Sequence, residues 1–340
     1  MPDDEGPTPT APPPAHSTRG GVTTLALLLT AALLLGAWVV PATAQAARGS
    51  SVTWSLPGAI GTVRVTTSPS PATTTVRDDL GTLATFTLGA RTVSLRGPQR
   101  LFAESTTSAV VRTTTWVRLL AQPFGGRVDP AWLGAALQDR SPDVLEVARQ
   151  YTTGAPDLVA ASGLRLAGDA SYGPLTATGR APGSDFNDYL QIPWTYGSTV
   201  DHPEPDQAGS LDCSGYVRMV LGYRLGLPLA LAPDGRGMPR RSFEILASAP
   251  GVVLVPDAGV RPALPASLTA GDLVFFDAST DDGTRIDHVG IYLGVDSTGA
   301  PRFLSSRQTV DGPTMGDVGG RSTLSGTGLY ALSLRAVRRV

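Results

Sequence analysis

The first candidate for chemistry is Cys213, the only cysteine among the 340 residues. It stands between Asp212 and Ser214, and apolar residues follow at helical spacing, at Val217, Val220, Leu221 and Leu225. Asp212 is a suitable N-cap for this helix, which places Cys213 in the first turn, where backbone N–H groups and the helix dipole favour a thiolate. A free cysteine is often only a small buried hydrophobe. The polar neighbours favour a reactive thiol, and the thiolate is the nucleophilic form.

The second candidate is His288, at the start of an apolar strand that alternates through Val289, Ile291 and Leu293. This alternation predicts one face in the core and the other, with His288 and Tyr292, along a cleft. The other histidine of this half, His202, lies in a proline-rich loop and is interpreted as solvated. A thiol within reach of an imidazole can form a thiolate–imidazolium pair near neutral pH and attack an amide carbonyl.

Four motifs of the C-terminal half resemble, in the same order, those of the NlpC-type cysteine peptidases of bacterial cell walls. They are Asp212-Cys213-Ser214-Gly215, Pro239-Arg240, Gly271-Asp272-Leu273-Val274-Phe275-Phe276 and Asp287-His288-Val289-Gly290-Ile291-Tyr292-Leu293-Gly294. The resemblance implies a pared-down papain-like domain in which Cys213 is the nucleophile and His288 is the base. It says nothing of residues 51–155.

Further site residues follow from the same resemblance. The family's third catalytic residue lies on the strand after the base, and Ser305 holds that position here. The family's Pro-Tyr-x-Trp-Gly segment reads Pro193-Trp194-Thr195-Tyr196-Gly197 in this chain, so the tyrosine hydroxyl is displaced or missing. The predicted substrate contacts are Trp194, Tyr196, Asp212, Ser214 and Arg240. Arg240, Arg241 and Arg307 are candidates to meet a peptide carboxylate, although exposed arginines are usually solvated.

The elements that must position these residues divide the chain into five parts. Residues 1–21 are rich in proline, threonine and alanine and are predicted to be disordered. Residues 22–44 hold an uncharged run from Val22 to Val40, followed by an Ala-x-Ala pattern, which indicates a signal peptide or an uncleaved membrane anchor. Residues 51–155 are predicted to form a β-rich domain of unknown role with two helices, opened by Asp129 and Asp143. A linker, 156–185, and the peptidase domain, 186–340, follow.

The sequence therefore predicts an exported α+β protein of the cell envelope that hydrolyses amide bonds in peptidoglycan stem peptides. No metal or organic cofactor is implied. The net charge of −2 gives no case for nucleic-acid binding, and the membrane is a partner only through residues 22–44 if these are uncleaved. Two alternatives stay open: an amidase or acyltransferase of the same fold, and a wall-binding or scaffold protein with a degenerate site.

Overall fold

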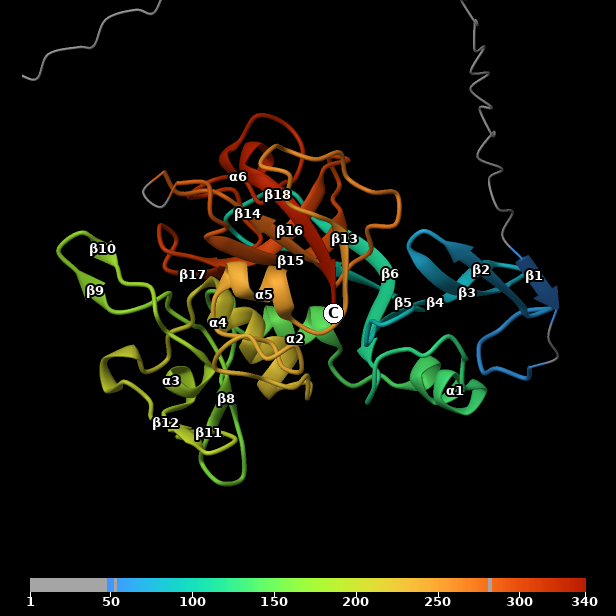
Figure 1. Cartoon of the computed structure of the whole chain (residues 1–340), viewed down its shortest axis with the longest axis horizontal. Coiled ribbons are helices and arrows are strands. Elements are labelled where there is room, and N and C mark those ends of the chain that lie inside the picture. The colour runs from blue at the N-terminus through green and yellow to red at the C-terminus, as the bar shows by residue number, and fades with distance from the viewer. Residues whose placement is uncertain (1–47, 52–53, 281–282) are drawn as a thin grey trace, which may run out of the picture. The chain divides into compact units, whose positions relative to one another are not determined.

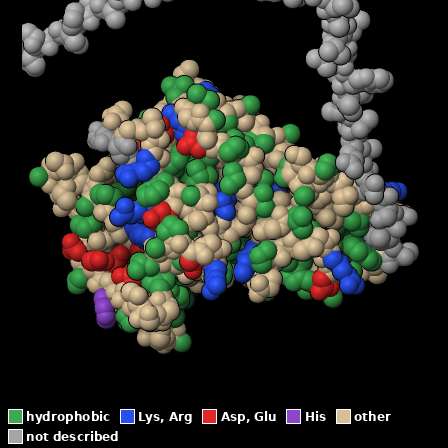
Figure 2. Space-filling view, in the orientation of Figure 1, with side chains coloured by type: hydrophobic (Ala, Val, Ile, Leu, Met, Phe, Trp, Pro, Cys, Tyr) green, Lys and Arg blue, Asp and Glu red, His purple; other side chains and the backbone are tan. Residues whose placement is uncertain are grey.

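The computed structural model describes residues 48–51, 54–280 and 283–340. The predictions for residues 1–21 and 22–44 fall outside these ranges. The described residues belong to one compact unit that spans residues 45–340. Within the described ranges no helix has both the length and the apolar character that a membrane span requires. The face shown in Figure 2 mixes apolar, charged and other polar side chains.

The first region is an antiparallel six-stranded sheet in which each strand pairs with the next along the chain (Figure 1). Its strands are β1 (Arg48–Ser51), β2 (Arg64–Pro69), β3 (Ala72–Asp78), β4 (Gly81–Thr87), β5 (Thr92–Phe102) and β6 (Val111–Leu119). Ala84 and Phe86 alternate on β4 and Val93 and Leu95 on β5, and all four side chains are buried. Strand β4 ends at Thr87, and the following Leu88 is 48% exposed.

The two expected helices are α1 (Pro130–Gln138) and α2 (Val144–Arg149), and both begin at the predicted caps. The carboxylate of Asp129 accepts from the N–H of Ala131, and that of Asp143 accepts from the N–H of Glu146. Leu133 and Leu137 of α1 pack in the core of the first sheet. The apolar side chains of α2 instead join the core that surrounds Cys213. The two helices therefore serve different cores, which their sequence patterns could not distinguish.

The C-terminal region is built on a second antiparallel six-stranded sheet, with the strand order β13-β18-β14-β15-β16-β17. Its strands are β13 (Val252–Val255), β14 (Leu273–Phe276), β15 (His288–Val295), β16 (Pro301–Arg307), β17 (Gly312–Thr314) and β18 (Leu334–Arg339). Helix α4 (Cys213–Val217) contacts β15 and β16, and α5 (Ser242–Ser248) contacts β15 and β18. A helix that begins at Cys213 and packs on an antiparallel sheet confirms the predicted α+β class.

Strand β15 differs from the prediction of one core face and one cleft face. Val289, Ile291 and Leu293 lie in the core shared with α4, as expected. Tyr292, on the opposite face, is only 6% exposed because it packs in a second core with Phe276, Phe303 and Tyr330, the last of these from α6 (Leu329–Ser333). The strand is therefore sandwiched between two apolar layers, and only its ends approach the surface.

The predicted linker, 156–185, contains short hairpins rather than an open loop. Strands β7 (Leu158–Val159) and β8 (Arg165–Ala167) form one, and β9 (Leu175–Thr176) and β10 (Gly179–Arg180) form the other. Ala167 and Ala170 are buried in the core around Cys213. The next elements are α3 (Phe186–Leu190), β11 (Trp194–Tyr196), β12 (Thr199–Asp201) and η1 (Pro205–Gln207). The domain boundaries drawn from the sequence stay a prediction.

Buried polar contacts join the two sheets. The guanidinium of Arg339, on β18, pairs with Asp272 and also donates to the Thr87 hydroxyl on β4, each at 2.7 Å. The carbonyl oxygen of Val340 accepts from the N–H and the hydroxyl of Thr92 on β5. These partners are shielded from water, so breaking either contact would leave buried polar groups unsatisfied.

Candidate active site

Cys213 is held in the first turn of α4 by the N-cap residue Asp212. The carboxylate of Asp212 accepts from the N–H of Gly215 at 2.8 Å. Gly215 itself is required by a close approach, since a Cβ at that position would lie 2.1 Å from the carbonyl oxygen of Ser184. The helix continues as the π-helical turn η2 (Arg218–Tyr223), and Gly226, with a φ of +79°, follows shortly after its end.

Asp212 is also the centre of a buried polar network. It accepts from Arg240 Nη2 at 2.8 Å, from the N–H of Gly183 at 3.0 Å and from the hydroxyl of Ser214 at 3.1 Å. Arg240 Nη1 in turn donates to Ser214 Oγ at 2.7 Å. Burial opposes ionisation of Asp212, but the Arg240 guanidinium and the hydrogen bonds outweigh it and lower the pKa of the carboxyl. The network fixes the start of α4 and hence the position of the thiol.

A cleft of about 500 Å³ opens over the thiol. Its lining includes Tyr172, Arg240, Phe243 and Asp287 besides Cys213. Cys213 is 6% exposed, and its Sγ lies 3.6 Å from the carbonyl oxygen of Asp287, the residue before His288. The thiol is therefore at the base of an open cleft and next to the strand that carries the histidine.

His288 is 8% exposed, and its ring contacts a side chain of the neighbouring strand β16. Its Nε2 lies 2.9 Å from Ser305 Oγ on β16, and the same hydroxyl accepts from Arg307 Nε at 3.2 Å. The rings of Tyr330 and Phe276 lie 5.2 and 5.8 Å from the imidazole centroid. Because Nε2 is engaged by Ser305, Nδ1 is the ring nitrogen left for a further partner.

Burial in this structure opposes a resting ion pair of Cys213 and His288. It raises the pKa of the Cys213 thiol to about 12, and the negative charge of Asp212 adds to this effect. Burial also lowers the pKa of His288 to about 3, helped by the positive charge of Arg307. Both shifts favour the uncharged forms of the two groups at neutral pH. The N-terminus of a five-residue helix does not offset the loss of hydration.

The other predicted site residues lie in three places. Asp212, Ser214 and Arg240 line the cleft beside Cys213, but much of their bonding capacity is used within their own network. Trp194 packs edge-on against Phe186, with ring centroids 5.1 Å apart. Tyr196 accepts a hydrogen bond from the buried Arg218. Neither of these aromatics lines the cleft, so substrate contact by Trp194 and Tyr196 stays a prediction.

Two residues near the site were missed or misassigned by sequence reasoning. Tyr172 lines the cleft from the segment before α3, and no motif marks it. Arg307 was grouped with arginines exposed to a peptide carboxylate, but it is only 2% exposed and its guanidinium lies 4.4 Å above the Tyr330 ring. Its place two residues after Ser305 on one strand was the available signal, since such residues share a face.

Comparison with known proteins finds one family model that matches the part of the chain holding this site. The family model described as NlpC/P60 family matches residues 191–312, a range that contains Cys213, His288 and Ser305. A solved structure from Staphylococcus aureus subsp. aureus Mu50, described as similar to lipoprotein, NLP/P60 family, shares 19% identity with a TM-score of 0.27. The alignment covers 62% of this chain and 48% of that one, so the chain spans about half its length. No curated protein matches the chain. The family match confirms the resemblance inferred from the motifs.

Proposed function

Because residues 191–312 match the NlpC/P60 family, whose members are generally cell-wall peptidases, we propose that this chain is an exported cysteine peptidase that hydrolyses amide bonds in peptidoglycan stem peptides. The observation that carries the proposal is the thiol at the base of an open cleft, next to the strand that carries His288, whose Nε2 is held by Ser305. A buried cysteine that only fills space needs neither the cleft nor the oriented imidazole.

The chemistry begins from neutral groups. As Sγ of Cys213 attacks the amide carbon, its proton passes to Nδ1 of His288, so no free thiolate accumulates beforehand. The C–N bond of the tetrahedral intermediate then breaks, and the imidazolium returns the proton to the leaving amine. Water, deprotonated by the same imidazole, hydrolyses the thioester and restores the thiol. Ser305 accepts the hydrogen of Nε2 and keeps the lone pair of Nδ1 directed to the proton it must receive.

The edge of the cleft supports an acidic peptide as the substrate. Arg241 lines the cleft and is exposed. Arginine matches a carboxylate with two parallel hydrogen bonds. A carboxylate of a peptide substrate would meet this side chain on entry, while the reacting amide lies deeper, beside Cys213.

A degenerate wall-binding protein is the second candidate, and one observation favours it. Ser305 carries no charge, and its hydroxyl is bonded to the positively charged Arg307. The imidazolium that forms during attack is therefore not stabilised by a carboxylate hydrogen-bonded to its Nε2. A stalled or absent reaction would follow if this site could not accept the proton.

Digestion of purified peptidoglycan separates the two functions. The wild-type chain should release fragments whose new amine and carboxyl ends, identified by mass spectrometry, name the bond that was cut. Cys213→Ala and His288→Ala should each abolish release, whereas His202→Ala, at an exposed loop position, should keep it. Binding to the wall without release by the wild type would reject the peptidase and favour the degenerate site. Activity retained in Cys213→Ala would reject the nucleophile.

A further inference from the structure

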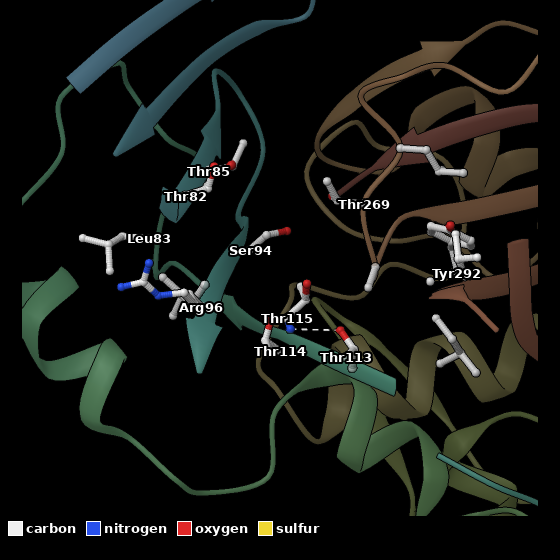
Figure 3. Close-up of a pocket in the computed structure, with 16 residues that line it drawn as sticks. Thr82, Leu83, Thr85, Ser94, Arg96, Thr113, Thr114, Thr115, Thr269 and Tyr292 are labelled. Atoms are coloured by element: carbon white, nitrogen blue, oxygen red, sulfur yellow. Dashed lines mark hydrogen bonds between the residues drawn. The ribbon is translucent and has the colours of Figure 1, made fainter. Parts of the chain in front are cut away.

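A second concave site lies far along β15 from His288, between the two sheets. It is a groove of about 510 Å³. One wall is formed by Thr85 of β4 and Ser94 of β5, and the other by Thr269 and Tyr292, with residues 113–115 of β6 between them (Figure 3). We call this space the hydroxyl groove. Ligand sites occur preferentially where two such parts of a protein meet.

The hydroxyl groove is defined by side chains that can both donate and accept hydrogen bonds. Eight of its lining residues carry a hydroxyl: Thr82, Thr85, Ser94, Thr113, Thr114, Thr115, Thr269 and Tyr292. Two of these are used within the protein, since Thr113 accepts from the N–H of Thr115 and Thr269 accepts from Arg339. The strand register gives part of the array, because Thr85 lies directly opposite Ser94, at the ~5 Å spacing of cross-strand neighbours.

Tyr292 presents a hydrogen-bonding group to this groove. The residue is only 6% exposed, and its hydroxyl borders the groove without a hydrogen-bonding partner among the described residues. A tyrosine at such a boundary buries its ring and keeps its polar end within reach of a ligand. Burial raises the pKa of Tyr292 to about 12, so the hydroxyl keeps its proton and remains a donor. The ring and the nearby Leu268 and Val295 give the same wall an apolar surface.

The charges indicate an uncharged ligand. Among the residues that the structure describes, Arg96 is the only charged one in the lining, and its guanidinium is already paired with Asp78 through bonds of 2.6 and 2.8 Å. A ligand carboxylate or ammonium would enter this groove without a free counter-charge and would lose hydration. An uncharged ligand with many hydroxyl groups would not have to give up the hydration of a charge, and its hydroxyls could bond to those of the groove.

We propose that the hydroxyl groove binds a neutral carbohydrate chain. Sugar hydroxyls donate and accept in the same way as the threonine hydroxyls, and the C–H faces of the rings fit the apolar surface formed by Tyr292, Leu268 and Val295. A peptide would instead be recognised through a ladder of main-chain hydrogen bonds and side-chain pockets, whereas the polar groups described here belong to side chains. The inference does not depend on the chemistry assigned to Cys213.

The test is binding of two uncharged probes, chitotetraose and maltotetraose, to the full chain by isothermal titration calorimetry. At least one should bind saturably. The double variant Thr85→Val/Thr115→Val removes two hydroxyls at nearly constant shape and should raise Kd at least tenfold, and Tyr292→Phe should raise it severalfold. Thr67→Val makes the same change on β2, outside the groove, and should leave Kd unchanged. Valine is at least as good a strand former as threonine, and equal urea midpoints would show that the variants are folded.

Two results would overturn the proposal. One is the absence of saturable binding of both sugars by the folded wild type, or binding that the double variant does not weaken. The other is binding of an uncharged tetra-alanine peptide with blocked ends that the double variant abolishes while neither sugar binds, which would assign the groove to a peptide.

Discussion

The Nε of Arg307 donates to the hydroxyl of Ser305 at 3.2 Å in the interior of the protein. The same oxygen lies 2.9 Å from His288 Nε2. The histidine is therefore oriented by a hydroxyl that is itself bonded to a cation, and not by a carboxylate or a second histidine. A serine in this position can fix the tautomer but does little to stabilise the imidazolium.

Ser305→Ala should lower turnover by about tenfold, which corresponds to about 1.4 kcal/mol in the activation barrier. Ser306→Ala should leave turnover nearly unchanged, because Ser306 points to the opposite face and donates to the carbonyl oxygen of Leu211 at 2.5 Å. Losing that bond should instead lower the free energy of unfolding by about 1–3 kcal/mol. Steady-state kinetics and urea unfolding of both variants check the prediction, and a larger kinetic loss in Ser306→Ala would contradict it.

Removing the charge of Arg307 should move the pH dependence of the reaction. Five charged or titratable groups bear on the imidazole: Arg307 from β16, Asp212 and Cys213 from α4, Tyr330 from α6, and the adjacent Asp287. Arg307 disfavours the imidazolium, so Arg307→Gln should raise the pKa of His288 and shift the acid limb of kcat/KM to higher pH. Arg307→Lys retains the charge and serves as the control. An unshifted acid limb in a folded Arg307→Gln would contradict this role.

The buried histidine should make stability depend on pH. The pKa of His288 is about 3 in the folded protein and about 6.5 in an unfolded chain. The unfolded state therefore binds more protons between these values, and stability should fall as the pH drops from 6.5 towards 3, by at most about 1.4 kcal/mol per pH unit. Urea unfolding of the wild type and of His288→Gln should show this extra slope in the wild type alone. Equal slopes would mean that the imidazole is not shielded from water.

Tyr172 should matter for catalysis although no motif marks it. It lines the cleft beside Cys213, and burial raises the pKa of its phenol, so it remains a proton donor. If the hydroxyl stabilises the oxyanion, Tyr172→Phe should lower kcat by on the order of a hundredfold. Tyr223→Phe makes the same change outside the cleft, on η2, and should leave kcat within twofold of the wild type. Equal effects of the two variants would count against a role for Tyr172.

Local signals predicted part of this site well. The cap at Asp212, the helix that carries Cys213 and the strand that begins at His288 each follow from neighbours in sequence. Ser305, which lies beside the imidazole, was indicated by the family resemblance instead. The position of Tyr172 depends on how the segment before α3 packs on distant elements, which local patterns do not encode. The protonation states were also beyond the sequence, because they depend on burial in the finished fold.

The contacts of Arg339 and Val340 with Thr87 and Thr92 have a consequence for how the protein can be divided. Strand β18 pairs with β14, and β14 pairs with the strand that carries His288. Removing the first sheet would therefore leave β18 without these hydrogen-bonding partners. In the order of the second sheet, β18 is separated from the strand that carries His288 by β14 alone. The part of the chain that matches the family is therefore not expected to fold independently of the first sheet in this protein.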